Sequence, residues 1–160
     1  MDCMVKNIKL VITDIDGVWT DGGMYYSENG VEIKKFNTRD GMGVERLRNN
    51  NIETIICTAE DTKIVKNRAK KLKIKKCFIG IKDKGNFIDY FSEKEKVDKK
   101  YIAYIGDDLN DLEIIKKVGF SACPRDAFGL VKANVDYICK TDGGKGAFRE
   151  FAELILENKQ

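Results

Sequence analysis

The segment LVITDIDGVWTDGG, residues 10–23, carries the strongest signal in this sequence. Four apolar or β-branched residues, Leu10–Thr13, run directly into Asp14 and Asp16, which one residue separates, and then into a glycine. Residues i and i+2 of an extended strand point to the same face, so both carboxylates can address one place. Carboxylates this close repel each other, and each raises the cost of ionising the other. A cation or a reaction must therefore compensate their charge.

Length and composition indicate an ordinary globular protein. The 160 residues, of which 42% are hydrophobic and 34% charged, suit one domain over residues 1–160. The net charge of +3 is too small to indicate a nucleic-acid partner. No window approaches the roughly 20 apolar residues of a membrane span, and the first residues lack a signal-peptide core. We therefore expect a cytoplasmic protein without a membrane or nucleic-acid partner.

Cysteine and histidine usage narrows the chemistry. The cysteines are odd in number and form no CxxC pair, which argues against a disulfide framework and against structural zinc. The chain contains no histidine, so catalytic triads and histidine-based metal sites are excluded. Any reaction must use carboxylates, lysine and hydroxyls. The cysteines, expected as reduced thiols, are Cys3, Cys57, Cys77, Cys123 and Cys139.

Short apolar runs alternate with helix-like segments along the chain. This alternation predicts an α/β fold: a Rossmann-like parallel sheet flanked by helices. One interruption, GGMYYSENGVEIKKF, predicts a β-hairpin that turns at Ser27–Gly30, directly after the first strand. The expected strands are Ile8–Thr13, Ile52–Cys57, Cys77–Ile79, Tyr101–Ile105, Phe120–Ala122 and Val135–Cys139.

Helical patterns fill the intervals between these strands. Several begin near an acidic residue that can cap a helix, namely Asp40, Asp61, Asp83 and Asp126. The expected helices are Met42–Asn49, Asp61–Leu72, Lys84–Lys94, Asp108–Val118, Ala127–Lys132 and Ala147–Glu157.

Residues that carry chemistry follow the ends of successive strands. In an open parallel sheet the carboxyl ends of the strands share one edge, and ligands bind there. We therefore expect residues far apart in the sequence to meet in one crevice. In chain order they are Asp14, Asp16, Thr58, Lys84, Asp107, Asp108 and Asp111.

These residue types suit a phosphate ester. Asp14, Asp16 and Asp107 form an all-oxygen cluster of the kind that holds Mg²⁺. Lys84 adds a positive charge and Thr58 a hydroxyl donor, so a phosphate would be neutralised and oriented. Asp14 could then attack phosphorus, while Asp16 gives a proton to the leaving oxygen and later takes one from water.

The motifs DIDGVWTDGG, CTAED, KDKG and GDDLND resemble, in order and spacing, the four motifs of the haloacid dehalogenase-like phosphatases. The resemblance implies that Asp14 forms an aspartyl-phosphate and that Asp16 is the general acid/base. It implies that Thr58 and Lys84 bind phosphate, and that Lys84 also restrains the nucleophile. It further implies that Asp107 completes a Mg²⁺ site with the Asp14 side chain and the Asp16 main-chain carbonyl.

Asp108 and Asp111 are expected just outside the metal ligands, where Asp111 either supports them or holds Lys84. The spacing between motifs leaves no room for a cap domain, so the crevice should be open to water. The hairpin and the tail TDGGKGAFREF resemble the small tetrameric phosphatases that act on 2-keto-3-deoxy sugar acid phosphates. That resemblance implies a homotetramer in which neighbouring subunits cover the crevice, with the hairpin and the tail reaching a neighbour.

One departure concerns the substrate. Octulosonate 8-phosphate enzymes usually follow the motif-two threonine with glycine and arginine, whereas this chain has Ala59 and Glu60. Glu60, with Arg68 and Lys71, resembles the pattern of the enzymes for nonulosonate 9-phosphates. The two basic residues lie three apart on one helix face, where they can pair with Glu60 or with a sugar carboxylate; a surface ion-pair cluster is the alternative. We expect a nine-carbon, sialic-acid-type substrate, with the eight-carbon acid a close second; Ala59 fits neither pattern.

Two other classes of protein share parts of this pattern. A phospho-receiver domain also groups aspartates, threonine and lysine at strand ends, but it would place adjacent acids after the first strand and a lone aspartate after the third. A non-catalytic module associated with a sugar-acid cytidylyltransferase would keep the fold without the activity. The intact set of four motifs favours the enzyme.

Overall fold

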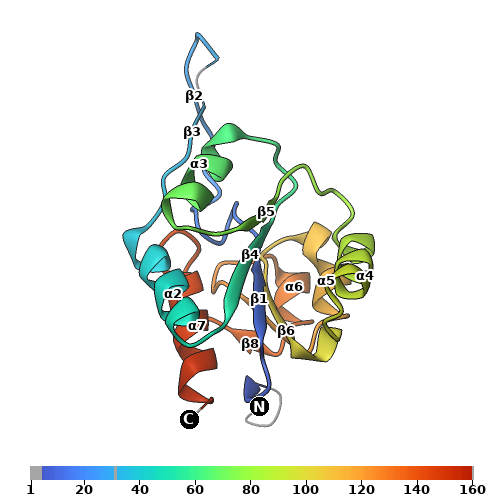
Figure 1. Cartoon of the computed structure of the whole chain (residues 1–160). Coiled ribbons are helices and arrows are strands. Elements are labelled where there is room, and N and C mark those ends of the chain that lie inside the picture. Colours follow the sequence, from blue (N-terminus) through green and yellow to red (C-terminus); the bar gives the residue numbers. More distant parts are fainter. Residues whose placement is uncertain (1–4, 31, 160) are drawn as a thin grey trace.

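The computed structural model describes residues 5–30 and 32–159. Its centre is a parallel sheet in the order β5-β4-β1-β6-β7-β8 (Figure 1). This confirms the predicted Rossmann-like sheet, with each strand close to its expected place. The strands are β1 (Leu10–Thr13), β4 (Glu53–Cys57), β5 (Lys76–Phe78), β6 (Ile102–Ile105), β7 (Phe120–Cys123) and β8 (Tyr137–Ile138).

Helices cover both faces of the sheet. On one face α2 (Thr38–Asn49), α3 (Lys63–Lys71) and α7 (Ala147–Glu157) pack against the sheet and form one apolar cluster. On the other face α4 (Lys84–Glu95), α5 (Leu112–Ile115) and α6 (Gly129–Lys132) form a second cluster. Figure 1 shows these two layers on either side of β1. The chain also forms short 3₁₀ turns at η1 (Lys99–Tyr101) and η2 (Leu109–Asp111).

The central strand β1 is buried along its whole length. Val11 packs into the cluster with α2 and α7, and Ile12 packs into the cluster with α4. A parallel strand covered on both faces needs a continuous apolar run, and the sequence supplies one. The chain turns polar at Asp14, where β1 ends at the carboxyl edge of the sheet.

The predicted hairpin is present. Strands β2 (Tyr25–Tyr26) and β3 (Glu32–Ile33) pair antiparallel, and the Gly30 amide donates to the Ser27 carbonyl at 2.9 Å. The hairpin projects from the body of the molecule (Figure 1). Between β1 and β4 the described residues hold only this hairpin and α2, and between α4 and β6 only η1. This matches the expected absence of a cap domain.

Helix boundaries differ from the sequence expectation in α2. The helix begins at Thr38 rather than Met42, because the Asn37 side chain caps it by accepting a hydrogen bond from the Arg39 amide. Asp40 therefore lies inside the helix and does not cap it. It is fully buried and accepts a hydrogen bond at 3.1 Å from the Arg149 amide in the first turn of α7.

Only one of the other proposed acidic caps is confirmed: the Asp83 side chain accepts from the Asn86 amide at the start of α4. Helix α3 begins after Thr62 rather than Asp61, and Asp126 accepts from the Gly143 amide instead of capping α6. The helix expected over Asp108–Val118 is shorter and in two parts, η2 and α5.

The cysteines at positions 57, 77, 123 and 139 are free thiols, and Cys3 lies outside the described residues. Among residues 5–30 and 32–159, no helix combines the length and the apolar character needed to cross a membrane.

Candidate active site

A crevice of about 290 Å³ opens at the carboxyl edge of the sheet. The loops that follow β1, β4 and β6 form its walls, as expected for a parallel sheet. Lys84 and Asp111 lie beneath it, in contact with Asp14 or with each other. The lining residues are Asp14, Asp16, Gly17, Gly22, Thr58, Ala59, Glu60, Asp107, Asp108 and Asn110.

Lys84, the first residue of α4, is the central cation of the site. Its ammonium nitrogen lies 2.7 Å from Asp14 Oδ2 and 2.5 Å from Asp111 Oδ1, and its side chain is fully buried. Burial alone would lower the pKa of this lysine, but the two carboxylates raise it above its usual value. Lys84 therefore stays charged and fixes the Asp14 carboxylate.

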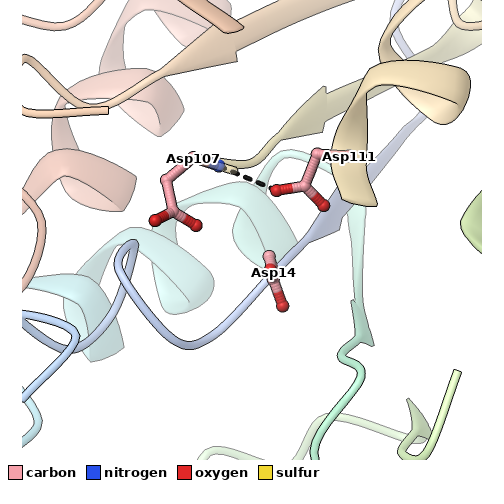
Figure 2. Close-up of side chains that lie close together, drawn as sticks. All are labelled: Asp14, Asp107 and Asp111. Atoms are coloured by element: carbon pink, nitrogen blue, oxygen red, sulfur yellow. Dashed lines mark hydrogen bonds between the residues drawn. The ribbon is translucent and has the colours of Figure 1, made fainter. Parts of the chain in front are cut away.

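Asp111 is a positioning residue. Its Oδ1 accepts hydrogen bonds from Lys84 and from the Tyr104 hydroxyl, and its Oδ2 accepts from the amides of Asp107 and Asp108. Figure 2 shows the contact from the Asp107 amide. Both carboxylate oxygens are thus engaged by donors of the protein. Asp111 holds Lys84 and the loop after β6 in place and has no oxygen free for a metal.

Three carboxylates crowd together: oxygen atoms of Asp14, Asp107 and Asp111 lie within 4.8 Å of one another (Figure 2). Burial, reinforced by the charge of Asp111, raises the pKa of Asp14 to about 6. Burial, reinforced by the charges of Asp14 and Asp111, raises the pKa of Asp107 to about 8. Among the described residues, Asp107 Oδ1 is buried without a hydrogen-bond partner. An oxygen-binding cation beside Asp14 and Asp107 would relieve both features.

Gly17 permits this crowding. Its φ of +81° is unfavourable for other residues, and a Cβ at this position would lie 1.9 Å from Asp107 Oδ2. The glycine after the second aspartate therefore lets the loop after β1 and the loop after β6 approach each other.

Asp16 has a partner that sequence reasoning missed. The Lys34 ammonium nitrogen lies 2.6 Å from Asp16 Oδ1, and the Lys34 side chain is only 1% exposed. Lys34 follows β3 directly, on the returning strand of the hairpin. The only sign of this contact in the sequence was the alternation of a β-strand, which places Glu32 and Lys34 on the same face of the hairpin.

The expected substrate residues separate into two places. Glu60 is exposed and lines the crevice, next to Ala59. Arg68 lies on α3, where it donates to the Asn37 carbonyl at 3.0 Å, and Lys71 ends that helix, exposed. In the described part of the chain, no ion pair joins Glu60 to either basic residue, and neither lines the crevice. Pairing of these basic residues with Glu60, one of the alternatives that the sequence leaves open, is therefore absent among the described residues.

The glycine-rich tail lies against its own chain. The Gly144 amide donates to the Val18 carbonyl at 3.0 Å, and a Cβ at Gly143 would lie 1.9 Å from the Gly17 carbonyl oxygen. Helix α7 then buries Phe148 and Phe151 in the core. Part of the tail therefore supports the loop after β1 and the core of the same chain, and the role expected for it at a neighbouring subunit stays a prediction.

A second hollow, of about 340 Å³, lies at the other end of β4, between α2 and the loop after α3. Val44, Ile52 and Ile74 contribute apolar surface there, and none of the clustered carboxylates lines it. The chemistry of the lining residues, rather than volume, therefore locates the site at the carboxyl edge.

Comparison with known proteins agrees with this geometry. Residues 81–150 match the haloacid dehalogenase-like hydrolase family. The 3-deoxy-D-manno-octulosonate 8-phosphate phosphatase of Haemophilus influenzae is 40% identical over 157 residues, which cover 98% of this chain and 87% of that protein.

Solved structures are equally similar. The cobalt-bound form of the Haemophilus influenzae enzyme superposes with a TM-score of 0.93 at 40% identity and covers 98% of this chain and 91% of that one. The Moraxella catarrhalis enzyme, in complex with magnesium ion, phosphate ion and KDO, gives a TM-score of 0.96 at 35% identity, with 99% and 91% covered. The chain therefore belongs to the haloacid dehalogenase-like hydrolases and, within them, to the family of the 3-deoxy-D-manno-octulosonate 8-phosphate phosphatases, which are phosphoric monoester hydrolases.

Proposed function

We propose that this protein is a Mg²⁺-dependent phosphatase for the phosphate monoester of a 2-keto-3-deoxy sugar acid. The observation that carries the proposal is the buried Lys84, which holds Asp14 at the floor of an open crevice and is itself held by Asp111. A phosphate in this crevice would meet the Asp14 carboxylate, which Lys84 fixes from beneath, and the loop that carries Thr58.

The reaction proceeds in two steps on the residues of this chain. In the first, an Asp14 carboxylate oxygen attacks phosphorus, the P–O bond to the sugar breaks, and Asp16 gives a proton to the departing oxygen. In the second, Asp16 takes a proton from water, which attacks the aspartyl-phosphate and releases inorganic phosphate. Asp14 and Asp16 return to their starting states, and the net change is hydrolysis of the ester.

The donor set suits a magnesium ion. The Asp14 and Asp107 carboxylates, with the Asp16 main-chain carbonyl, would hold it, and the unpaired Asp107 Oδ1 supports this assignment. When bound, the ion neutralises phosphate charge beside the two carboxylates. The magnesium and cobalt in the related structures favour the same choice.

The relatives support the eight-carbon substrate, 3-deoxy-D-manno-octulosonate 8-phosphate, because their names specify it. Glu60 supports the second candidate, a nonulosonate 9-phosphate, because it places a carboxylate on the crevice wall. The preference for nine carbons thus rests on Glu60 alone and stays a prediction. The cytoplasmic location, and the homotetramer in which neighbouring subunits would cover the crevice, also stay predictions.

A substrate screen tests the proposal. Purified protein with Mg²⁺ should release phosphate from the eight-carbon or nine-carbon acid at least about a hundredfold more efficiently, in kcat/KM, than from glucose 6-phosphate. EDTA should abolish turnover and excess Mg²⁺ should restore it. Equal efficiency on all sugar phosphates would contradict the substrate class, and full activity in chelator would contradict the metal site. Complete inactivity with every ester would support the non-catalytic accessory module instead.

A further inference from the structure

The hairpin projects from the body of the molecule (Figure 1). It carries one buried lysine, Lys34, whose side chain reaches the active site. Lys34 lies 18 positions after Asp16 in the chain, yet its ammonium nitrogen is 2.6 Å from Asp16 Oδ1. Glu32, on the same face of the returning strand, lies 3.5 Å from the same nitrogen. Burying a long charged side chain this completely is unusual unless its charge is used.

The two oxygens of Asp16 are in different environments. Oδ1 accepts from Lys34, whereas Oδ2 is buried and has no hydrogen-bond partner among the described residues. Asp16 itself lines the crevice, and Lys34 does not. The ion pair therefore fixes the carboxylate by one oxygen and leaves the other oxygen unpaired.

We propose that Lys34 is the positioning residue of the general acid/base: it fixes Asp16 so that the unpaired Oδ2 faces the leaving oxygen of the bound ester. This inference rests on the proposed function, in which Asp16 carries the proton in both steps. Lys34 acts through Asp16 rather than on the substrate, because its side chain is 1% exposed and lies behind the crevice wall. The proton moves between Asp16 and the departing oxygen, and Lys34 keeps its own.

The hairpin also has a suitable control. Lys35, the next residue, points to solvent with 54% of its side chain exposed and pairs with Asp21 at 2.6 Å. A Lys35→Met change perturbs the same strand and removes the same charge, but it does not touch Asp16. Differences between Lys34→Met and Lys35→Met therefore report on the contact with Asp16.

The test uses leaving groups that differ in their need for a proton. Nitrophenolate leaves readily without protonation, whereas phenolate and a sugar alkoxide are stronger bases and depend more on the acid. The quantity measured is kcat/KM, which covers the steps through ester cleavage. Lys34→Met should lose about tenfold to a hundredfold on phenyl phosphate and on the sugar acid phosphate, but about threefold or less on p-nitrophenyl phosphate. Lys35→Met should change all three by about twofold or less.

A double-mutant cycle separates positioning from other roles. In an Asp16→Asn background the proton donor is absent, so adding Lys34→Met should leave the ratio of phenyl to p-nitrophenyl phosphate efficiencies unchanged. A further loss in that background, or an equal loss on all esters from Lys34→Met alone, would overturn the inference. Should Lys34→Met fail to fold by circular dichroism, Lys34→Gln keeps a donor of similar length and should show the same selectivity, reduced to about threefold to tenfold.

The outcome for Lys34 is independent of the sugar. A wild-type protein that hydrolyses both aryl esters but no sugar acid phosphate would contradict the proposed substrate, while the aryl pair would still decide the role of Lys34. A wild-type protein that hydrolyses none of the esters would overturn both proposals.

Discussion

Lys84 and Asp111 form a fully buried ion pair, with Nζ 2.5 Å from Oδ1, at the base of the candidate active site. Four donors converge on Asp111: the lysine, the Tyr104 hydroxyl and two main-chain amides of the loop after β6. Asp107 stands beside it with an unpaired oxygen and with a pKa that burial raises to about 8. Asp111 should therefore stabilise the folded protein, whereas Asp107 should destabilise it as long as no cation is bound.

We therefore expect Asp111→Asn and Asp107→Asn to change the free energy of unfolding in opposite directions. The first replaces an acceptor for four donors with an amide that can accept on one side only, and should lower the free energy of unfolding by about 3–5 kcal/mol. The second removes a carboxylate whose pKa burial raises to about 8, and in EDTA should be neutral or stabilising by about 1–3 kcal/mol. Urea unfolding in EDTA measures both.

A control for this contrast is the response to Mg²⁺. The wild-type protein should gain stability on addition of the ion, because binding favours the folded state, and Asp107→Asn should lose most of that gain. An Asp107→Asn protein that is as unstable as Asp111→Asn in EDTA would show that both carboxylates are structural.

Asp40 gives a pH prediction outside the crevice. Burial raises its pKa from 3.8 to about 7, although the Arg149 amide donates to one oxygen. The folded state therefore holds this proton between about pH 4 and pH 7 while the unfolded state has lost it, so the contribution to stability falls as pH rises through that window. Asp40→Asn removes this dependence. Its stability relative to wild type should rise by on the order of 2 kcal/mol between pH 5 and pH 8.

Thermal or urea unfolding in EDTA at the two pH values measures this difference, since the other titrating groups are shared and cancel. Glu45→Gln, on the exposed face of the same helix, is the control and should show no such trend. A difference between Asp40→Asn and wild type that stays constant with pH would mean that Asp40 is ionised throughout the range.

Much of this architecture is predictable from local pattern. The buried run before Asp14 predicted β1, and strand ends predicted which residues meet, because a parallel sheet brings its carboxyl ends to one edge. The acidic run after β6 predicted Asp107 in the crevice, and contact with Lys84 was one of the two roles open for Asp111. These features depend on short-range sequence and on a general rule of topology.

Other features depend on contacts between distant segments. Lys34 reaches Asp16 only because the hairpin folds back, and the sequence of a projecting hairpin does not show that one of its lysines is buried. Asp40 accepts a hydrogen bond from the first turn of α7 and does not cap its own helix, because Asn37 caps that helix earlier in the chain. The glycines of the tail fit against the loop after β1, and this close approach between segments more than 100 positions apart leaves no periodic signal.

Glu60 distinguishes the two candidate substrates. Replacing it with arginine adds a positive charge to the crevice wall and removes an acceptor for hydroxyls of the longer sugar. An unmatched polar group costs about 1–3 kcal/mol, so kcat/KM for the nonulosonate 9-phosphate should fall by roughly tenfold to a hundredfold. Activity on p-nitrophenyl phosphate should stay nearly unchanged, because Lys84 and the carboxylates are untouched.

The ratio between those two substrates is the decisive quantity, with the exposed Glu45→Arg as a charge-matched control. If Glu60→Arg lowers kcat/KM equally on the nonulosonate 9-phosphate and on p-nitrophenyl phosphate, Glu60 supports the phosphate site rather than the sugar. An improved efficiency on the eight-carbon acid would favour that substrate, in agreement with the names of the relatives.

The central claim, covalent catalysis by Asp14, is tested most directly by pre-steady-state mixing of Asp16→Asn with p-nitrophenyl phosphate and Mg²⁺. This variant lacks the base for the second step, but the nitrophenolate still leaves in the first. We predict a burst of nitrophenol equal to the enzyme concentration, with one phosphoryl group on the peptide that contains Asp14, and neither burst nor label in the Asp14→Asn/Asp16→Asn double variant. Turnover by the wild-type protein, with no burst and an unmodified Asp14 peptide in Asp16→Asn, would contradict it.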